Sequence, residues 1–226
     1  QRRGRLLETL GASVDDLTPA VVTRLARAAR SAGPALAERS AADIAEALGR
    51  VGERFGAEGD AVRAEALERL PESAAVSTAM ARAILDGMAH DWTRARLHRL
   101  LEVEFGDPER LDRLVQGSGR TAMAIGPGLC VQIVSGSVPG VSVTALIRSL
   151  MVKGPTLLKP GFGDGVLPEI FVRELRAEDP VLAQAVAVVY WPGGSQELED
   201  AALAEADVVT AYGSDETVSA VRARLS

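Results

Sequence analysis

Residues 129–159 read LCVQIVSGSVPGVSVTALIRSLMVKGPTLLK, which is the pattern of one β-α-β unit. A β-branched run over 129–134 predicts a buried strand, and the amphipathic stretch 141–151 predicts the helix after it. A second short apolar run, 156–159, predicts the next strand. Because strands joined by a helical crossover lie parallel in one sheet, this stretch indicates an α/β fold.

The same alternation continues to the end of the chain. The predicted strands span 129–134, 156–159, 185–190 and 207–211, and the predicted helices span 141–151, 167–176, 196–204 and 215–224. We therefore expect a Rossmann-like parallel sheet with helices on both faces.

The first half of the chain is rich in Ala, Arg, Leu and Glu and nearly free of β-branched runs. Helix-start signals recur in it: Thr18-Pro19 and Asp107-Pro108 each join a capping side chain to a first-turn proline, and Ser40 and Asp60 are further caps. These signals predict five or six helices, and we expect the helix that Asp60 caps to end at Leu70-Pro71.

The change of pattern near residue 117 predicts two parts. We divide the chain into a helical N-terminal region, 1–117, and a Rossmann-like domain, 118–226. The chain begins with Gln1, and its last residues stop inside a helical pattern. We therefore expect a fragment, truncated before a further domain.

Composition excludes several classes of function. Lys and Arg number 25 against 31 Asp and Glu, and the resulting charge of −6 argues against nucleic acid as a partner. No apolar run is long enough for a membrane span, and no signal peptide precedes the helices. The lone cysteine, Cys130, permits no internal disulfide, so we expect a cytoplasmic protein.

Metal binding and local thiol chemistry find little support. His90 and His98 lie eight residues apart on predicted helices, without the spacing of metal ligands, so we predict no metal site. Cys130 lies in the middle of a predicted strand, where an inert small apolar side chain is commoner than a nucleophile.

Four loops follow the predicted strands, and ligands of open α/β sheets bind outside the carboxyl ends of the strands. The loops read SGSVPG (135–140), KPGFG (159–163), WPGGS (191–195) and YGS (212–214). All are small and polar, as close approach of a ligand requires. The candidate cofactor-binding residues in them are Ser135, Lys159, Pro160, Gly161, Gly193, Gly213 and Ser214.

Two of these residues carry the sharpest hypotheses. Lys159 ends a buried strand and could meet an anionic ligand; alternatively it reaches solvent or pairs with an acid such as Asp164. Ser214 begins a helix whose free amides suit a phosphate, or it is an ordinary N-cap. No G-x-G-x-x-G motif follows any strand, which disfavours an ordinary Rossmann dehydrogenase.

Three segments resemble the coenzyme-binding domain of the aldehyde dehydrogenase superfamily in order and spacing. They are GLCVQIVSGSVP (128–139), TLLKP (156–160) and DVVTAYGS (207–214). The runs SGSVPG (135–140) and AYGSDETV (211–218) are most similar to the acyl-CoA reductase branch, whose best-known members make the long-chain aldehyde for bacterial luminescence. The resemblance covers about residues 126–226.

The resemblance implies roles for individual residues. It assigns Lys159 to the adenosine ribose, and Gly213 and Ser214 to the pyrophosphate. Ser137 stands where the superfamily usually has an Asn of the oxyanion hole, so it is the candidate catalytic residue, although a serine reaches less far. The family's catalytic Cys and Glu base lie beyond the last motif found here.

The implied activity is NAD(P)H-dependent reduction of an acyl-CoA or acyl-carrier thioester to an aldehyde, with this chain supplying the cofactor-binding part. In the implied mechanism a Cys thiolate attacks the thioester, the thiol leaves, and a hydride reduces the enzyme-bound acyl group. Alternatives are a non-catalytic nucleotide-binding or scaffolding module, an aldehyde-oxidising dehydrogenase and a γ-glutamyl phosphate reductase relative. The acyl chain length stays open, as does homo-oligomer formation.

The loop after Lys159 bears on the choice of cofactor. NAD-preferring relatives commonly place a Glu three residues beyond this lysine, and here Phe162 holds that place. Without that carboxylate, the ribose hydroxyls lose a hydrogen-bond acceptor, and a 2′-phosphate is no longer repelled by a negative charge. We therefore favour NADP(H) over NAD(H). Alternatively, Gly161 and Gly163 only form a tight turn and Phe162 packs on the adenine or in the core, or Asp164 replaces the Glu.

Overall fold

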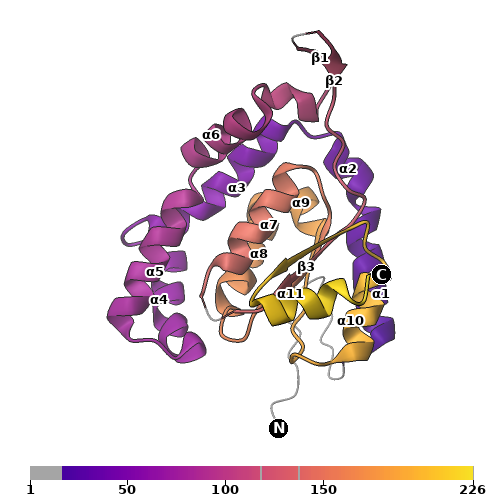
Figure 1. Cartoon of the computed structure of the whole chain (residues 1–226). Helices are drawn as coiled ribbons and strands as arrows, with labels where there is room; N and C mark the ends of the chain where they lie inside the picture. Colours follow the sequence, from indigo (N-terminus) through magenta and orange to yellow (C-terminus); the bar gives the residue numbers. More distant parts are fainter. Residues whose placement is uncertain (1–16, 118, 137, 226) are drawn as a thin grey trace.

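The computed structural model describes residues 17–117, 119–136 and 138–225 and confirms the α/β fold class (Figure 1). The helices of the first half are α1 (Pro19–Ser31), α2 (Gly33–Ala37), α3 (Ala41–Gly56), α4 (Ala61–Ala74), α5 (Thr78–Asp91), α6 (Arg94–Phe105) and the 3₁₀ helix η1 (Pro108–Leu111). A two-stranded antiparallel sheet follows, formed by β1 (Val115–Gln116) and β2 (Thr121–Ala122).

The second half alternates strands and helices as predicted, except that two helices in succession, the second of them unpredicted, separate the second and third strands of the parallel sheet. Its elements are β3 (Cys130–Val134), α7 (Val141–Met151), β4 (Thr156–Lys159), α8 (Val166–Glu178), α9 (Pro180–Gln184), β5 (Val186–Val188), α10 (Gln196–Leu203), β6 (Val208–Tyr212) and α11 (Asp215–Arg222).

The predicted caps begin the helices of the first half. The side chain of Thr18 accepts a hydrogen bond from the Val21 amide at 3.4 Å, and Ser40 accepts one from Asp43 at 3.0 Å. Asp60 accepts from Val62 at 2.8 Å and starts α4. These bonds satisfy amides that the first helical turn leaves unpaired.

The predicted end of α4 at Leu70-Pro71 is wrong, because the helix continues to Ala74. Pro71 removes one backbone donor, but Leu70 is fully buried and its packing holds the turn in place. The helix ends where Ala75 adopts a φ of 56°, which lets Val76 donate to the Pro71 carbonyl at 3.1 Å.

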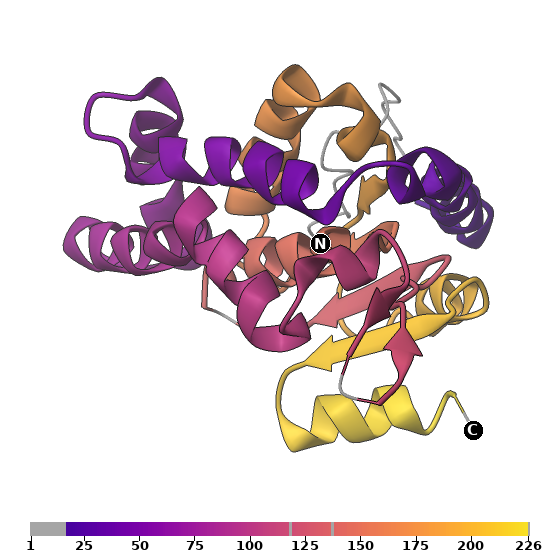
Figure 2. The ribbon, with the colours of Figure 1, turned by 90° about the horizontal axis from the view of Figure 1, so that it is seen from above.

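The four long strands form one parallel sheet in the order β5-β4-β3-β6. After β3 the chain moves outward through β4 to β5, and then returns to the other side of β3 with β6. The strand order therefore reverses between β3 and β6, which is the point where ligands of such sheets bind. Figure 2 shows α11 lying next to β6.

Helices cover both faces of the sheet, as predicted. Alternate side chains of β3, among them Val131 and Ile133, pack in a cluster with α1 and α10. On the opposite face α7 and α8 cover the sheet, and α3 packs on them in turn, so that α7 and α8 lie within the curve formed by α3–α6 (Figure 1).

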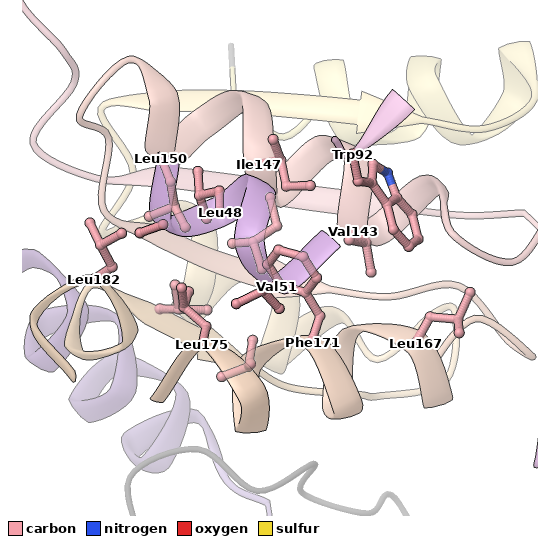
Figure 3. Packing of buried hydrophobic residues seen from close by; sticks show 14 of the residues in the cluster. Leu48, Val51, Trp92, Val143, Ile147, Leu150, Leu167, Phe171, Leu175 and Leu182 are labelled. Atoms are coloured by element: carbon pink, nitrogen blue, oxygen red, sulfur yellow. The ribbon is translucent and has the colours of Figure 1, made fainter. Parts of the chain in front are cut away.

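The larger core joins the helical first half to the sheet. Figure 3 shows Leu48 and Val51 of α3 packed against Ile147 of α7 and Phe171 of α8. Three aromatic rings, Phe55, Trp92 and Phe171, lie with centroids 5.5–6.2 Å apart in edge and stacked arrangements. The Trp92 indole also donates to Thr144 at 2.9 Å, which fixes the end of α5 against α7.

Candidate functional site: the carboxyl edge of the sheet

All four parallel strands end at one edge, so the loops after them are neighbours. The pairing register places Lys159 of β4 opposite Ile133 of β3, and Val134 opposite Tyr212 of β6. The structure thereby gathers the loops that the sequence singled out. Whether the candidate residues in them bind a cofactor stays a prediction.

Lys159 is buried at this edge with 6% of its surface exposed. Its Nζ lies 5.9 Å from the ring centroid of Tyr190, and among the described residues it forms no ion pair and no hydrogen bond. Burial lowers the pKa of Lys159, and the negative charge of Glu199 opposes this shift only in part. The site therefore contains a desolvated cation that no acid in the described part of the chain bonds.

The alternative that pairs Lys159 with Asp164 is wrong, because Asp164 turns inward to the first turn of α7. Its carboxylate oxygens accept hydrogen bonds from the amides of Gly140 at 2.6 Å and Ser142 at 2.8 Å. Asp164 is fully buried, and burial raises its pKa to about 6, while its contacts with Ser142 and Gly140 oppose the shift. For the same reason Asp164 does not replace the missing ribose carboxylate.

The first loop packs against the last one. The Ser135 amide donates to the Tyr212 carbonyl at 2.6 Å, and its hydroxyl lies 3.4 Å from the Thr217 hydroxyl. A Cβ atom on Gly213 would lie 2.9 Å from the Ser135 carbonyl oxygen, so only glycine fits without a shift. Ser137, the candidate oxyanion residue, lies outside the described residues.

Ser214 is the N-cap of α11, since its hydroxyl accepts a hydrogen bond from the Thr217 amide at 3.3 Å. This confirms the capping hypothesis and leaves anion binding there as a prediction. The first turn also carries the exposed acids Asp215 and Glu216.

The second loop touches the first through glycine. A Cβ atom on Gly161 would lie 2.2 Å from the Gly136 carbonyl oxygen, while the preceding Pro160 is buried. Phe162 is 71% exposed, so the alternative that places it in the core is wrong. In the third loop, Gly193 has open space around it, since a Cβ atom there would meet nothing within 4 Å.

The remaining candidates lie away from this edge. His98 bonds Glu46 at 2.8 Å and His90 contacts Arg96; in residues 17–117, 119–136 and 138–225, no three potential metal ligands gather. Burial raises the pKa of the Cys130 thiol inside β3, which opposes formation of a thiolate. No helix in the described ranges is both long and apolar enough to cross a bilayer.

The sequence missed the role of Asp164. Its partners, Gly140 and Ser142, lie 24 and 22 residues away, and no local pattern links them to an aspartate after a glycine-rich loop. The signal that could have found it is the N-terminus of α7, which begins at Gly140 without a capping side chain of its own.

Comparison with known proteins gives three findings on sequence. The pattern of the family described as acyl-CoA reductase (LuxC) matches residues 36–226. A long-chain acyl-protein thioester reductase from Aliivibrio fischeri is 25% identical over 130 residues, which cover 56% of this chain and 27% of that protein. Long-chain acyl-protein thioester reductase 2 from Photobacterium leiognathi is 24% identical over 134 residues, with the same coverage.

The fold is also found in a solved structure. An NAD-dependent benzaldehyde dehydrogenase from Corynebacterium glutamicum is similar with a TM-score of 0.73 at 17% identity, over 99% of this chain and 47% of the dehydrogenase. The chain therefore has the fold of part of an aldehyde dehydrogenase, as the motifs predicted. It spans less than half of that chain.

Proposed function

Because this chain belongs to the acyl-CoA reductase (LuxC) family, we propose that it serves the reduction of a long-chain acyl thioester to an aldehyde. We assign to it the part of that enzyme which binds the nicotinamide coenzyme. The observation that carries the assignment is Lys159, a buried cation at the edge of the sheet where ligands bind, which no acid among the described residues bonds.

The residues at this edge fit a dinucleotide. An anionic ligand would supply the bonded acid that Lys159 lacks among the described residues. The close approaches of Gly161 and Gly213 to neighbouring backbone require residues without a side chain where the loops meet. The open space at Gly193 adds room at the end of β5. These observations support binding by Ser135, Lys159, Pro160, Gly161, Gly193, Gly213 and Ser214.

The pyrophosphate is best received by α11. In a sheet of this order the helix after the first strand is the usual anion site, but the N-terminus of α7 already holds the Asp164 carboxylate. The N-terminus of α11 follows β6, on the other side of the point between β3 and β6 where the strand order reverses. It lies beside Ser135, and its N-cap is Ser214. We therefore assign the pyrophosphate to Gly213 and Ser214, and we assign the adenosine ribose to Lys159 because the family resemblance implies it.

The coenzyme, when bound, supplies the hydride that converts the acyl thioester, with one proton, into aldehyde and thiol. Cys130 is the lone cysteine of the sequence and is buried in β3, so it does not serve as the nucleophile. A thiolate mechanism then needs a cysteine outside these 226 residues. Ser137 remains our candidate for a donor to the oxyanion.

We further propose that NADP(H) is preferred over NAD(H). Phe162 occupies the place of the ribose-binding Glu, and it is exposed rather than packed in the core. Asp164, the other carboxylate of this loop, is engaged with α7. A 2′-phosphate beside Lys159 would therefore meet a cation and no carboxylate of the loop.

Titration of the protein with NADPH and with NADH at equal ionic strength tests both proposals. Saturable binding with tighter NADPH supports them, tighter NADH defeats the cofactor preference, and no binding of either defeats the proposed function in favour of a non-catalytic module. Coenzyme oxidation by the whole enzyme with a long-chain acyl-CoA and with an acyl-protein then distinguishes the two thioester carriers.

A further inference from the structure

The buried carboxylate of Asp164 joins two loops of the proposed site. It lies one residue before the N-cap of α8, and its two oxygens accept separate hydrogen bonds from Gly140 and Ser142 in the β3–α7 connection. The Asp164 amide in turn donates to the Gly161 carbonyl at 3.1 Å, which closes the β4–α8 loop on itself. One residue thus bonds to both loops, to the β3–α7 connection through its side chain and to the β4–α8 loop through its amide.

The same two loops meet again at their other ends. Gly161 packs on Gly136 so closely that a Cβ atom would lie 2.2 Å from the Gly136 carbonyl oxygen. The β3–α7 connection is therefore held at Gly136 by contact and at Gly140 by the carboxyl group. Lys159 and Phe162 flank the contact on the β4 side.

The elements around Asp164 are apolar or uncharged at their contacts. Met88 of α5 packs against Gly140, and the Ser73 carbonyl and Ala74 at the end of α4 pack against Gly163. No charged group of α4, α5, α7 or α8 shifts the pKa of Asp164; burial alone raises it, against the contacts from Gly140 and Ser142. The two amides are thus the polar partners that the structure gives this carboxylate.

We propose that Asp164 is a positioning residue, whose carboxyl group holds the β3–α7 and β4–α8 loops in the arrangement that receives the coenzyme. This inference rests on the proposed function. The carboxyl group suits the task because each of its oxygens accepts from one amide. An Asn at this position turns a donor toward one of the two amides.

The test compares Asp164→Asn with Asp179→Asn. Asp179 is the control, because it too is buried and accepts from two helix amides, those of Val181 and Leu182 at the start of α9. It also pairs with Arg39 at 2.7 Å, and all of these contacts lie away from the proposed site. Dissociation constants for oxidised NADP, which is stable in acid, are measured from pH 5 to pH 8 for the wild type and both variants. Hydrogen–deuterium exchange of the unliganded proteins is followed over the same range in peptides covering 138–143 and 160–166.

We expect Asp164→Asn to weaken coenzyme binding about tenfold at pH 5 and by less at pH 8. Protection of the two loops should fall as the pH rises through 6 in the wild type and in Asp179→Asn, because burial favours the neutral acid, and it should be low at every pH in Asp164→Asn. If Asp164→Asn does not fold, the wild-type exchange profile and Asp164→Glu, which keeps the charge and moves it, provide the same comparison.

Two results overturn the inference: equal pH dependence of binding in the wild type and Asp164→Asn, or loop protection in the wild type that does not fall as the pH rises from 5 to 8. Absence of coenzyme binding by the wild type at every pH defeats the proposed function, and with it the role of Asp164 toward the coenzyme. The exchange data, which need no ligand, then still show whether the carboxylate holds the loops.

Discussion

At the scale of single residues, the charge of Lys159 is the feature most directly tied to ligand binding. We expect Lys159→Met, which keeps the apolar stem, to weaken NADPH binding by about 1.5 to 3 kcal/mol, because a hydrogen bond to a charged group is lost. The free energy of unfolding should not fall, since the variant no longer buries an unpaired cation. Calorimetric titration and urea denaturation measure the two quantities.

Lys153→Met is the control for this change, because it removes the same charge from the other lysine. Lys153 pairs with Asp112 at 2.7 Å, so its loss should reduce stability and leave NADPH affinity unchanged. Unchanged affinity in Lys159→Met, or an equal loss in both variants, would contradict the assignment of Lys159.

The raised pKa of Asp164 also predicts how the stability of the fold depends on pH. Because its pKa rises from 3.8 to about 6 in the fold, the neutral acid is favoured, and the stability it contributes is complete below about pH 4 and lost as the pH rises through 6. The free energy of unfolding of the wild type, taken relative to Asp164→Asn, should therefore fall by up to about 3 kcal/mol between pH 4 and pH 7.

Urea denaturation at one-unit pH steps measures this difference. Carboxyls whose pKa is lowered by arginines, such as Glu65 beside Arg173, act in the opposite direction but are common to both proteins and cancel. A difference that stays constant over the range would mean that Asp164 titrates as an exposed acid does.

At the scale of elements, the contact between α3 and the end of α5 depends on glycine. A Cβ atom on Gly52 would lie 2.2 Å from the Trp92 carbonyl oxygen, a backbone atom that cannot turn aside. Gly52→Ala should therefore destabilise the fold by about 1 to 3 kcal/mol or more. Gly87→Ala in α5, where no atom lies within 4 Å, should instead stabilise it by about 0.5 to 1 kcal/mol. Thermal unfolding of both variants checks the pair, and a neutral Gly52→Ala would refute it.

The elements also show how far the sequence could predict the fold. Strand positions were predicted within one or two residues because β-branched runs and loop residues are local signals, and Thr18, Ser40 and Asp60 began helices for the same reason. The continuation of α4 past Pro71 was missed because it depends on burial of Leu70. In the candidate site, the loops could be predicted from strand order, but the choice of partner for Asp164 is a long-range contact.

At the scale of the whole molecule, the larger core contains residues from both halves of the chain. We therefore expect the helical region and the sheet to unfold in one cooperative transition. The two tryptophans lie in different clusters, Trp92 in the larger core and Trp191 in the cluster with α1 and α10. The variant Trp191→Phe keeps only the fluorescence of Trp92, and the variant Trp92→Phe keeps only that of Trp191. In each variant the fluorescence and circular dichroism transitions in urea should coincide; two separate midpoints would show that the halves unfold independently.

The burial of Lys159 gives the protein an unusual surface chemistry. Its cationic side chains are almost all arginines, and the two lysines, Lys153 and Lys159, both have buried side chains. An amine-selective acylating reagent therefore finds few targets besides the chain terminus. Lys153 forms an ion pair with Asp112, whereas burial lowers the pKa of Lys159 and thereby favours its neutral, nucleophilic amine. A reagent that reaches the edge of the sheet should therefore modify mainly Lys159. A bound dinucleotide should shield this lysine, so that peptide mass mapping with and without the ligand detects occupancy of the site.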